Sequence, residues 1–200
     1  MNKSIFIFTI IFSLIACSDN YKETKCSSNA ELNHDRVIGA IIDNNYPKFK
    51  HYLNCIDDVN HINSSGSTLL MHSVGYINAV SKPPDRQKFM SGDSTAFLIS
   101  YPYVADLLEK GAEPDLRNKQ GTTALVVAVY HGRLDSALLL LQKGANPNLF
   151  GDKSTPVMIA AQQCHKSVLN LLVSFGGDIL LKNNLGLSAS DILSKCSIKS

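Results

Sequence analysis

The chain has 200 residues, of which 44% are hydrophobic and 18% are charged, and its formal net charge at pH 7 is +2. This length and composition fit one globular domain with appended segments. Acidic and basic residues are spread along the chain, which argues against a nucleic-acid partner, because such a partner requires a concentrated basic face.

Residues 1–16 are predicted to be a lipoprotein signal peptide. A short basic start precedes an almost purely apolar stretch at residues 5–15. As a helix this stretch is about 16 Å long, too short for a bilayer core of about 30 Å, and the layout is typical of a secretory signal. It ends in Leu14-Ile15-Ala16-Cys17, which resembles the lipobox of bacterial lipoproteins.

The lipobox resemblance implies a lipid on Cys17, with cleavage after Ala16 and acylation of the new amine. An ordinary signal peptide with a chance cysteine is the alternative. Two or three acyl chains anchor a protein stably, whereas one does not. Ser18 replaces the Asp that usually marks inner-membrane retention, which implies an outer-membrane lipoprotein facing the periplasm. Residues 17–30 are polar and are predicted to form a lipidated tether.

Two repeated phrases dominate the rest of the chain. A Leu-Leu-x-Lys-Gly phrase ends at Gly111 and at Gly144 and returns in degraded form at Gly176, so that the glycines are 33 and 32 residues apart. A second phrase, which begins with a threonine, precedes the helical pattern at Thr123 and Thr155. A period of about 33 residues with these two phrases resembles the ankyrin repeat.

This resemblance implies an all-α solenoid of helix-turn-helix repeats with hairpin-like fingers. Hydroxyl side chains can cap the first helix of each repeat, and the glycines can end the second helices in the left-handed conformation. The predicted capping residues are Thr68, Thr123, Thr155 and Ser188. The predicted ankyrin-repeat domain covers 31–200, with repeats at 31–63, 64–118, 119–150 and 151–183 and a half-repeat cap at 184–200.

The second repeat carries an insertion, because Thr68 and Thr123 are 55 positions apart instead of 33, an excess of 22 residues. The excess is placed at 75–96, between the two helices of the repeat. Long loops are often functional, and a tolerated insertion is the alternative, because loop-closure entropy grows slowly with length. In the functional interpretation the contact residues are Lys82, Arg86, Lys88, Phe89 and Met90.

Four cysteines remain once Cys17 is lipidated, and the inferred compartment is oxidising. They allow three pairings. The repeat resemblance favours Cys26–Cys55 and Cys164–Cys196. Buried free thiols are the alternative, because stacked repeats are about 10 Å apart and a disulfide requires Cα atoms within about 7 Å. The sequence contains no Cys-x-x-Cys motif and therefore indicates neither a redox motif nor a zinc site.

The sequence contains no motif typical of an enzyme. A Gly-x-Ser-x-Gly elbow, a phosphate-binding loop and a His-Glu-x-x-His motif are all absent from it. The six histidines are scattered along the chain. No catalytic residue, metal site or cofactor is therefore predicted.

Partners of ankyrin-repeat proteins usually lie in the concave face that the first helices and the fingers form. By the repeat register, the first helices contribute His72, Tyr76, Val127, Tyr130, His131, Ile159, Gln162 and Gln163, and the fingers contribute Ile62, Arg117, Phe150 and Lys182. Ile62 and Phe150 are apolar where water is expected, and with Tyr130 and Tyr76 they predict an exposed patch for a partner. A scatter of single exposed hydrophobic residues is the alternative.

The resemblances imply a monomeric protein-binding module rather than an enzyme. Small bacterial ankyrin lipoproteins resemble the immunity proteins that neutralise phospholipase toxins delivered by type VI secretion. Fold alone does not establish this role. The alternatives are an envelope scaffold that stabilises a stress-protection enzyme and a factor directed at a host.

Overall fold

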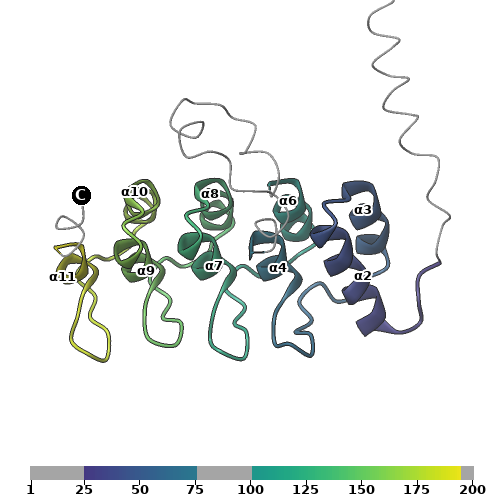
Figure 1. Ribbon diagram of the computed structural model, residues 1–200, viewed down its shortest axis with the longest axis horizontal. Helices are drawn as coiled ribbons and strands as arrows, with labels where there is room; N and C mark the ends of the chain where they lie inside the picture. The colour runs from purple at the N-terminus through teal and green to yellow at the C-terminus, as the bar shows by residue number, and fades with distance from the viewer. Residues whose placement is uncertain (1–24, 76–100, 195–200) are drawn as a thin grey trace, which may run out of the picture.

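The computed structural model describes residues 25–75 and 101–194, which form a row of helix pairs. The pairs are α2 (Ala30–Ile42) with α3 (Tyr46–Asn54), α4 (Leu69–Gly75) with α6 (Tyr101–Glu109), α7 (Ala124–Tyr130) with α8 (Leu134–Gln142), and α9 (Pro156–Gln162) with α10 (Lys166–Ser174), and the single helix α11 (Ala189–Leu193) follows them. Figure 1 shows the first helix of each pair in an inner layer, the second in an outer layer, and the fingers extending below. This arrangement is the predicted all-α solenoid.

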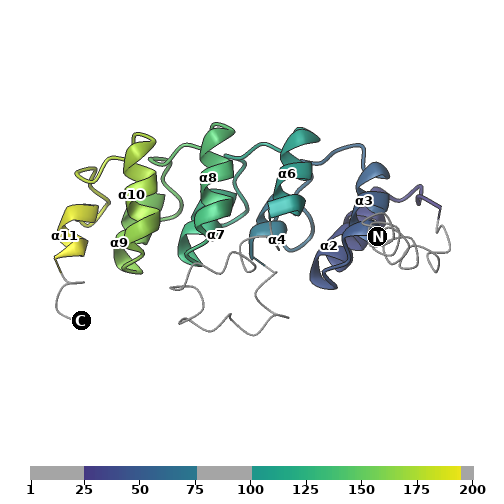
Figure 2. The same ribbon diagram turned by 90° about the horizontal axis from the view of Figure 1, so that it is seen from above.

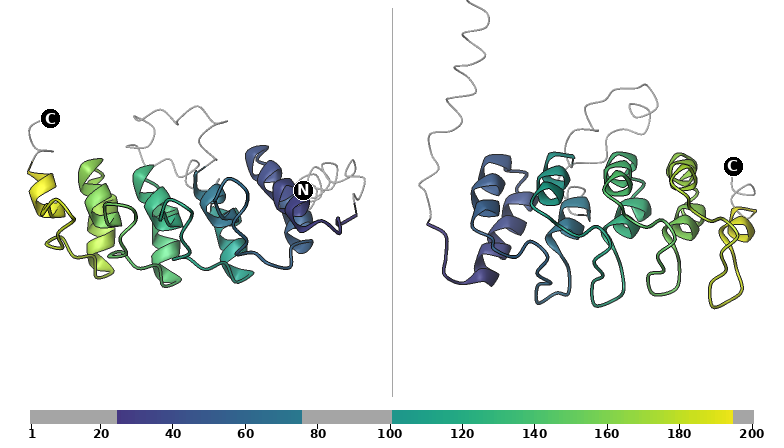
Figure 3. Two further views of the ribbon diagram at one scale, coloured as in Figure 1. Left: turned by 90° about the horizontal axis from the view of Figure 1, so that it is seen from below. Right: turned by 180° about the vertical axis from the view of Figure 1, so that it is seen from behind.

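The row of repeats is gently curved, and the inner helices lie on the inside of the curve (Figures 2 and 3). No helix among the described residues is long and apolar enough to cross a membrane. The predicted signal peptide, most of the tether and residues 76–96 of the predicted insertion lie outside the described residues. The insertion was placed between the two helices of the second repeat, and α4 and α6 flank that part of the chain.

Helices α4, α7, α9 and α11 begin at the predicted hydroxyl caps, whereas Asn29 caps α2. Thr123 Oγ1 accepts a hydrogen bond from the Val126 amide at 3.3 Å. Equivalent bonds at Thr68, Thr155 and Ser188 confirm the other three caps. At Ser188 the cap is reciprocal, because Asp191 accepts hydrogen bonds from the Ser188 hydroxyl and amide. These bonds, the hydroxyl one first, lower the pKa of the Asp191 carboxyl.

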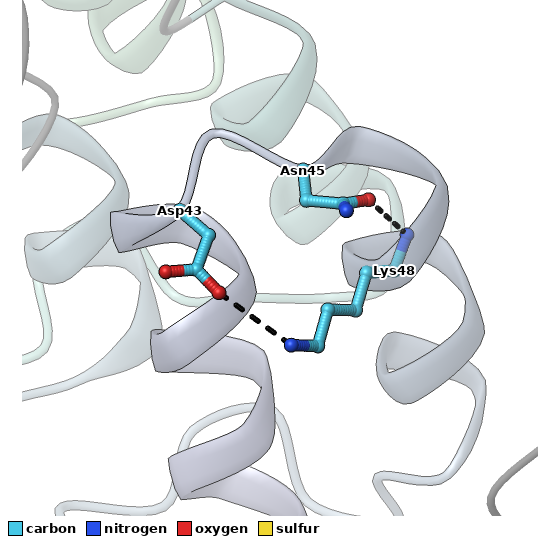
Figure 4. A network of polar contacts seen from close by, with 3 residues as sticks. All are labelled: Asp43, Asn45 and Lys48. Atoms are coloured by element: carbon cyan, nitrogen blue, oxygen red, sulfur yellow. Dashed lines mark hydrogen bonds and ion pairs between the residues drawn. The ribbon is translucent and has the colours of Figure 1, made fainter. Parts of the chain in front are cut away.

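The turn between the two helices of a repeat uses a left-handed residue. Asn44 has a φ of 50°, and the equivalent residues Gly132 and Cys164 have φ values of 66° and 57°. In the first repeat the turn ends at Asn45, whose Oδ1 accepts a hydrogen bond from the Lys48 amide at 3.0 Å. The Lys48 ammonium lies 3.5 Å from the carboxylate of Asp43, which joins α3 to the end of α2 (Figure 4).

A single hydrophobic core runs between the two layers through every repeat. The outer helices contribute a buried side chain at the same position of each repeat. It is a tyrosine in the first repeat and a leucine in the others: Tyr52, Leu107, Leu140 and Leu172. Small residues, Ala128 and Ala160, are fully buried on the inner helices. Because each repeat contacts its neighbours, the burial joins them into one continuous core.

The first two repeats are also joined by aromatic and polar contacts. The rings of Phe49 and Tyr103 meet edge to face with centroids 4.8 Å apart. Asp106 accepts a hydrogen bond from the Tyr46 hydroxyl at 2.7 Å and lies 3.2 Å from the Lys50 ammonium. Burial, followed by the hydrogen bond to Asp106, raises the pKa of Tyr46 to about 12.

A disulfide closes the N-terminal repeat by joining Cys26 to Cys55, with the Cα atoms 5.3 Å apart. This is the pairing that the repeat resemblance favoured. Asn33 strengthens the closure, because its Nδ2 donates to the carbonyls of Ser27 and Cys55. Cys164 is disulfide-bonded too, and its expected partner, residue 196, lies outside the described residues.

Candidate partner-binding face

Side chains in the fingers bond each finger to the next one and so hold the inner face in shape. Asn60 is the first of these side chains. Its Nδ2 donates to the carbonyl of Gly111 at 3.2 Å, and its Oδ1 accepts from the amide of Glu113 at 2.8 Å. One amide side chain therefore satisfies a donor and an acceptor of the following repeat.

The same bridge recurs further along the row. Asn148 donates to the carbonyl of Gly176 at 2.8 Å and accepts from the amide of Asp178 at 2.7 Å. Asp115 accepts from the amide of Asn146 at 3.0 Å. We call Asn60, Asp115 and Asn148 the finger ladder. This role is not predicted from the sequence, although an Asn or Asp recurs at the same finger position in three repeats.

Tyr130 is the candidate aromatic contact residue of the inner face, because its side chain is 56% exposed at the end of α7. Its ring meets His131 edge to face, with the centroids 5.2 Å apart. Burial first, and then the charge of Arg133, lower the pKa of His131. At neutral pH this histidine is therefore an uncharged imidazole that can donate or accept a hydrogen bond beside an exposed aromatic ring.

Ile62 lies in the first finger, and His72 lies in α4, the inner helix that follows this finger. The Ile62 side chain is exposed, as predicted. His72 is half-buried, and its Nε2 lies 3.3 Å from the Nδ2 of the buried Asn63. Burial lowers the pKa of His72. The contact therefore joins α4 to the first finger, and only part of the His72 ring faces outward.

The structure corrects the expectation that Phe150 is an exposed contact residue. Phe150 is half-buried and packs against the hydrophobic core, as Val127 and Ile159 do. The aromatic ring is drawn onto the core because this removes its apolar surface from water, whereas Ile62, Arg117 and Lys182 at the equivalent finger positions stay exposed. Arg117, Lys182, Gln162 and Gln163 are exposed, in line with their prediction as surface residues.

The remaining predicted contact residues lie outside the described part of the chain. They are Tyr76, Arg86 and Phe89, together with Lys82, Lys88 and Met90 of the insertion. Within the described ranges, no group of His, Cys, Asp or Glu side chains is arranged to hold a metal ion. The described face combines an aromatic anchor, an exposed aliphatic residue and polar side chains, a composition typical of protein interfaces.

Comparison with known proteins agrees with this geometry. Residues 98–183 match a family model described as ankyrin repeats in three copies. The chain is also similar to an ankyrin repeat domain-containing protein 63 from Homo sapiens and another from Mus musculus, with 42% identity over 72 residues in each. These residues are 36% of this chain and only 19% and 18% of the two relatives.

The matched family and the helix pairs with their fingers together identify the fold as an all-α ankyrin-repeat solenoid. Ankyrin repeats are a protein–protein interaction module, in which stacked repeats present an extended surface. The inner face of the described stack is therefore the candidate site.

Proposed function

We propose that this chain is a membrane-anchored periplasmic inhibitor, an immunity protein that binds and neutralises a secreted antibacterial toxin of the lipase type. The observation that carries the proposal is that three side chains, Tyr130, Ile62 and Arg117, are exposed on a stack whose fingers are bonded to one another. A face held in one shape loses little conformational freedom when it covers the mouth of a toxin's active site.

The N-terminal sequence supports the anchored part of the proposal. The lipobox-like ending at Cys17 fits a lipid that holds the inhibitor at the membrane where a toxin arrives. The disulfide between Cys26 and Cys55 fits an oxidising compartment such as the periplasm. Ser18 favours the outer membrane over the inner one.

The partner is tested by affinity purification of the tagged, lipidated protein from its own envelope, with mass spectrometry of what it retains. A secreted lipase recovered at near-equal stoichiometry, and inhibited by the purified protein, is the expected result. Recovery of a housekeeping envelope enzyme instead would favour the scaffold function. If purified candidate lipases from the same cells are neither bound nor inhibited, the inhibitor function is wrong.

The anchor is tested by replacing Cys17 with Ala. The variant is expected to leave the membrane fraction for the soluble periplasmic fraction, because it has no sulfur to carry the lipid, while its thermal unfolding stays unchanged. Cell fractionation followed by immunoblotting measures the shift, with Cys26→Ala as the control for loss of a different cysteine. Membrane association that persists in Cys17→Ala would contradict the lipid anchor.

A further inference from the structure

The C-terminal end of the described stack exposes positions that the earlier repeats bury. In α3, residues 46, 50 and 53 share one helix face. Tyr46 and Lys50 both contact Asp106 of α6, so this face points toward the next outer helix. The residues equivalent to Leu53 in the two following outer helices are Leu108 and Leu141, and all three are buried.

Val173 occupies the equivalent position in α10, and its side chain is 45% exposed, compared with 5% for Leu141. The following finger shows the same difference. Ile179 is 37% exposed, whereas Val59, at the equivalent position of the first finger, is 7% exposed. In the earlier repeats, the next repeat covers the surface that corresponds to Val173 and Ile179.

Leu180 takes the place of the finger-ladder residues. Its finger position is equivalent to those of Asn60, Asp115 and Asn148, which bond the next finger. The Leu180 side chain has no polar group and is 68% exposed. The ladder therefore ends in an apolar side chain. We define the end patch as Val173, Phe175, Ile179 and Leu180, four exposed hydrophobic residues between positions 173 and 180.

Among the described residues, the half-repeat covers only the inner layer at this end. Helix α11 packs against α9. Figure 1 shows α11 at the level of the inner helices, with no described helix beyond α10 in the outer layer. Solenoids ordinarily end in a repeat with a polar outer face, because an apolar end associates with other molecules.

We propose that the end patch is the interface of a homodimer, in which two copies meet end to end about a twofold axis. Charged residues beside the patch indicate that its partner is a second copy of this chain. Lys166 lies at the start of α10 and Asp178 lies just beyond its end, and both are exposed. Helix α10 has nine residues, a length of about 13 Å.

A twofold axis places two α10 helices antiparallel, so that Lys166 of each copy lies near Asp178 of the other. The apolar residues between them then bury one another, and the two charge pairs form a polar rim. The arrangement is self-complementary, closes at two copies and leaves the inner face open. It replaces the monomer expected from the sequence and does not depend on the proposed function.

Sedimentation equilibrium of the full chain, in a density-matched detergent, tests the dimer. The wild type is expected to be a dimer whose dissociation constant rises on the order of a hundredfold in Leu180→Asn, because both copies lose a buried leucine. Asn stands at this position in two earlier repeats, so the finger accepts it. Leu185→Asn is the matched control, since Leu185 is exposed outside the patch, at the tip of the same finger.

The charge pairs provide a second test that is specific for the twofold axis. Lys166→Glu alone and Asp178→Lys alone each place like charges together and are expected to be monomers. An equimolar mixture is expected to form the heterodimer, because both pairs are then of opposite charge. A wild type that is monomeric at all concentrations, an assembly that grows beyond two copies, or an equal effect of Leu180→Asn and Leu185→Asn would overturn the proposal.

Discussion

His34 is a buried residue whose imidazole ring is only partly hydrogen-bonded. Its Nε2 lies 2.9 Å from the Asp58 carbonyl, whereas its buried Nδ1 has no hydrogen-bond partner. The ring of His61 is 4.7 Å away, centroid to centroid. Burial is the largest cause that lowers the pKa of His34, and the proximity of His61 adds to it. The folded protein therefore holds this imidazole in its neutral form.

The free energy of unfolding is expected to fall as the pH drops below about 6.5, because the unfolded chain then binds a proton at His34 that the folded chain resists. This stability is fully present above the unfolded pKa and is lost as the pH falls through the lowered folded pKa. Urea unfolding at about pH 7.5 and about pH 5.5 measures the change, and His34→Phe should reduce it. An unchanged pH dependence in the variant would contradict this account.

Cys164 is a non-glycine residue in the left-handed region, at the turn where the preceding repeat has Gly132. A side chain costs about 1–2 kcal/mol in this conformation. Cys164 is also disulfide-bonded. This position therefore combines an unfavourable backbone conformation with a covalent link.

Two substitutions separate these effects at Cys164. Cys164→Gly and Cys164→Ser both remove the disulfide, and the glycine variant is expected to be more stable by about 1 kcal/mol, because only serine keeps a Cβ at a φ of 57°. Thermal denaturation of the two variants, each with its disulfide absent, gives the difference. Equal melting temperatures would show that the turn tolerates a side chain without cost.

At the scale of elements, side chains of the finger ladder bond neighbouring fingers to one another. Asn148 makes two bonds to the next repeat, and Leu180 makes none. Asn148→Ala is expected to lower the free energy of unfolding by about 1–2 kcal/mol, because two backbone groups of the fourth finger lose their partner.

Chemical denaturation measures this loss. The control is Asn184→Ala, an exposed amide at the tip of the last finger, which should change stability by less than about 0.5 kcal/mol. Amide exchange should also become faster at Asp178 in Asn148→Ala, since that amide donates to Asn148 in the wild type. Equal stability of the two variants would contradict the structural role of the ladder.

At the scale of the whole molecule, we expect partner binding and stability to depend on different side chains of the inner face. Tyr130→Ala is expected to weaken partner binding at least about tenfold and to leave the melting temperature nearly unchanged, because the ring is 56% exposed. Phe150→Ala is expected to lower the melting temperature, because this ring packs on the core. Calorimetric titration and thermal scans separate the two effects.

The control for the binding measurement lies on the outer layer. Gln142 is exposed at the end of the outer helix α8, so Gln142→Ala should change neither binding nor stability. A loss of binding in Gln142→Ala equal to that in Tyr130→Ala would place the partner elsewhere on the stack.

Much of the architecture is determined by the sequence, because its determinants are local. The spacing of Gly111, Gly144 and Gly176 marks the ends of three outer helices, and all three residues have positive φ values. Thr123 and Thr155 mark the starts of inner helices for the same reason, since a cap bonds an amide three residues away. The exposed Ile62 and Tyr130 followed from the same register.

Contacts between repeats were decided only by the tertiary structure. Phe150 is half-buried because its ring packs against the hydrophobic core, and His72 is held by the side chain of Asn63 in the preceding finger. The finger ladder and the exposed end patch depend likewise on what lies one repeat further along. A repeat period establishes which residues are equivalent, but burial depends on whether a neighbour covers them, and that is a property of the folded stack.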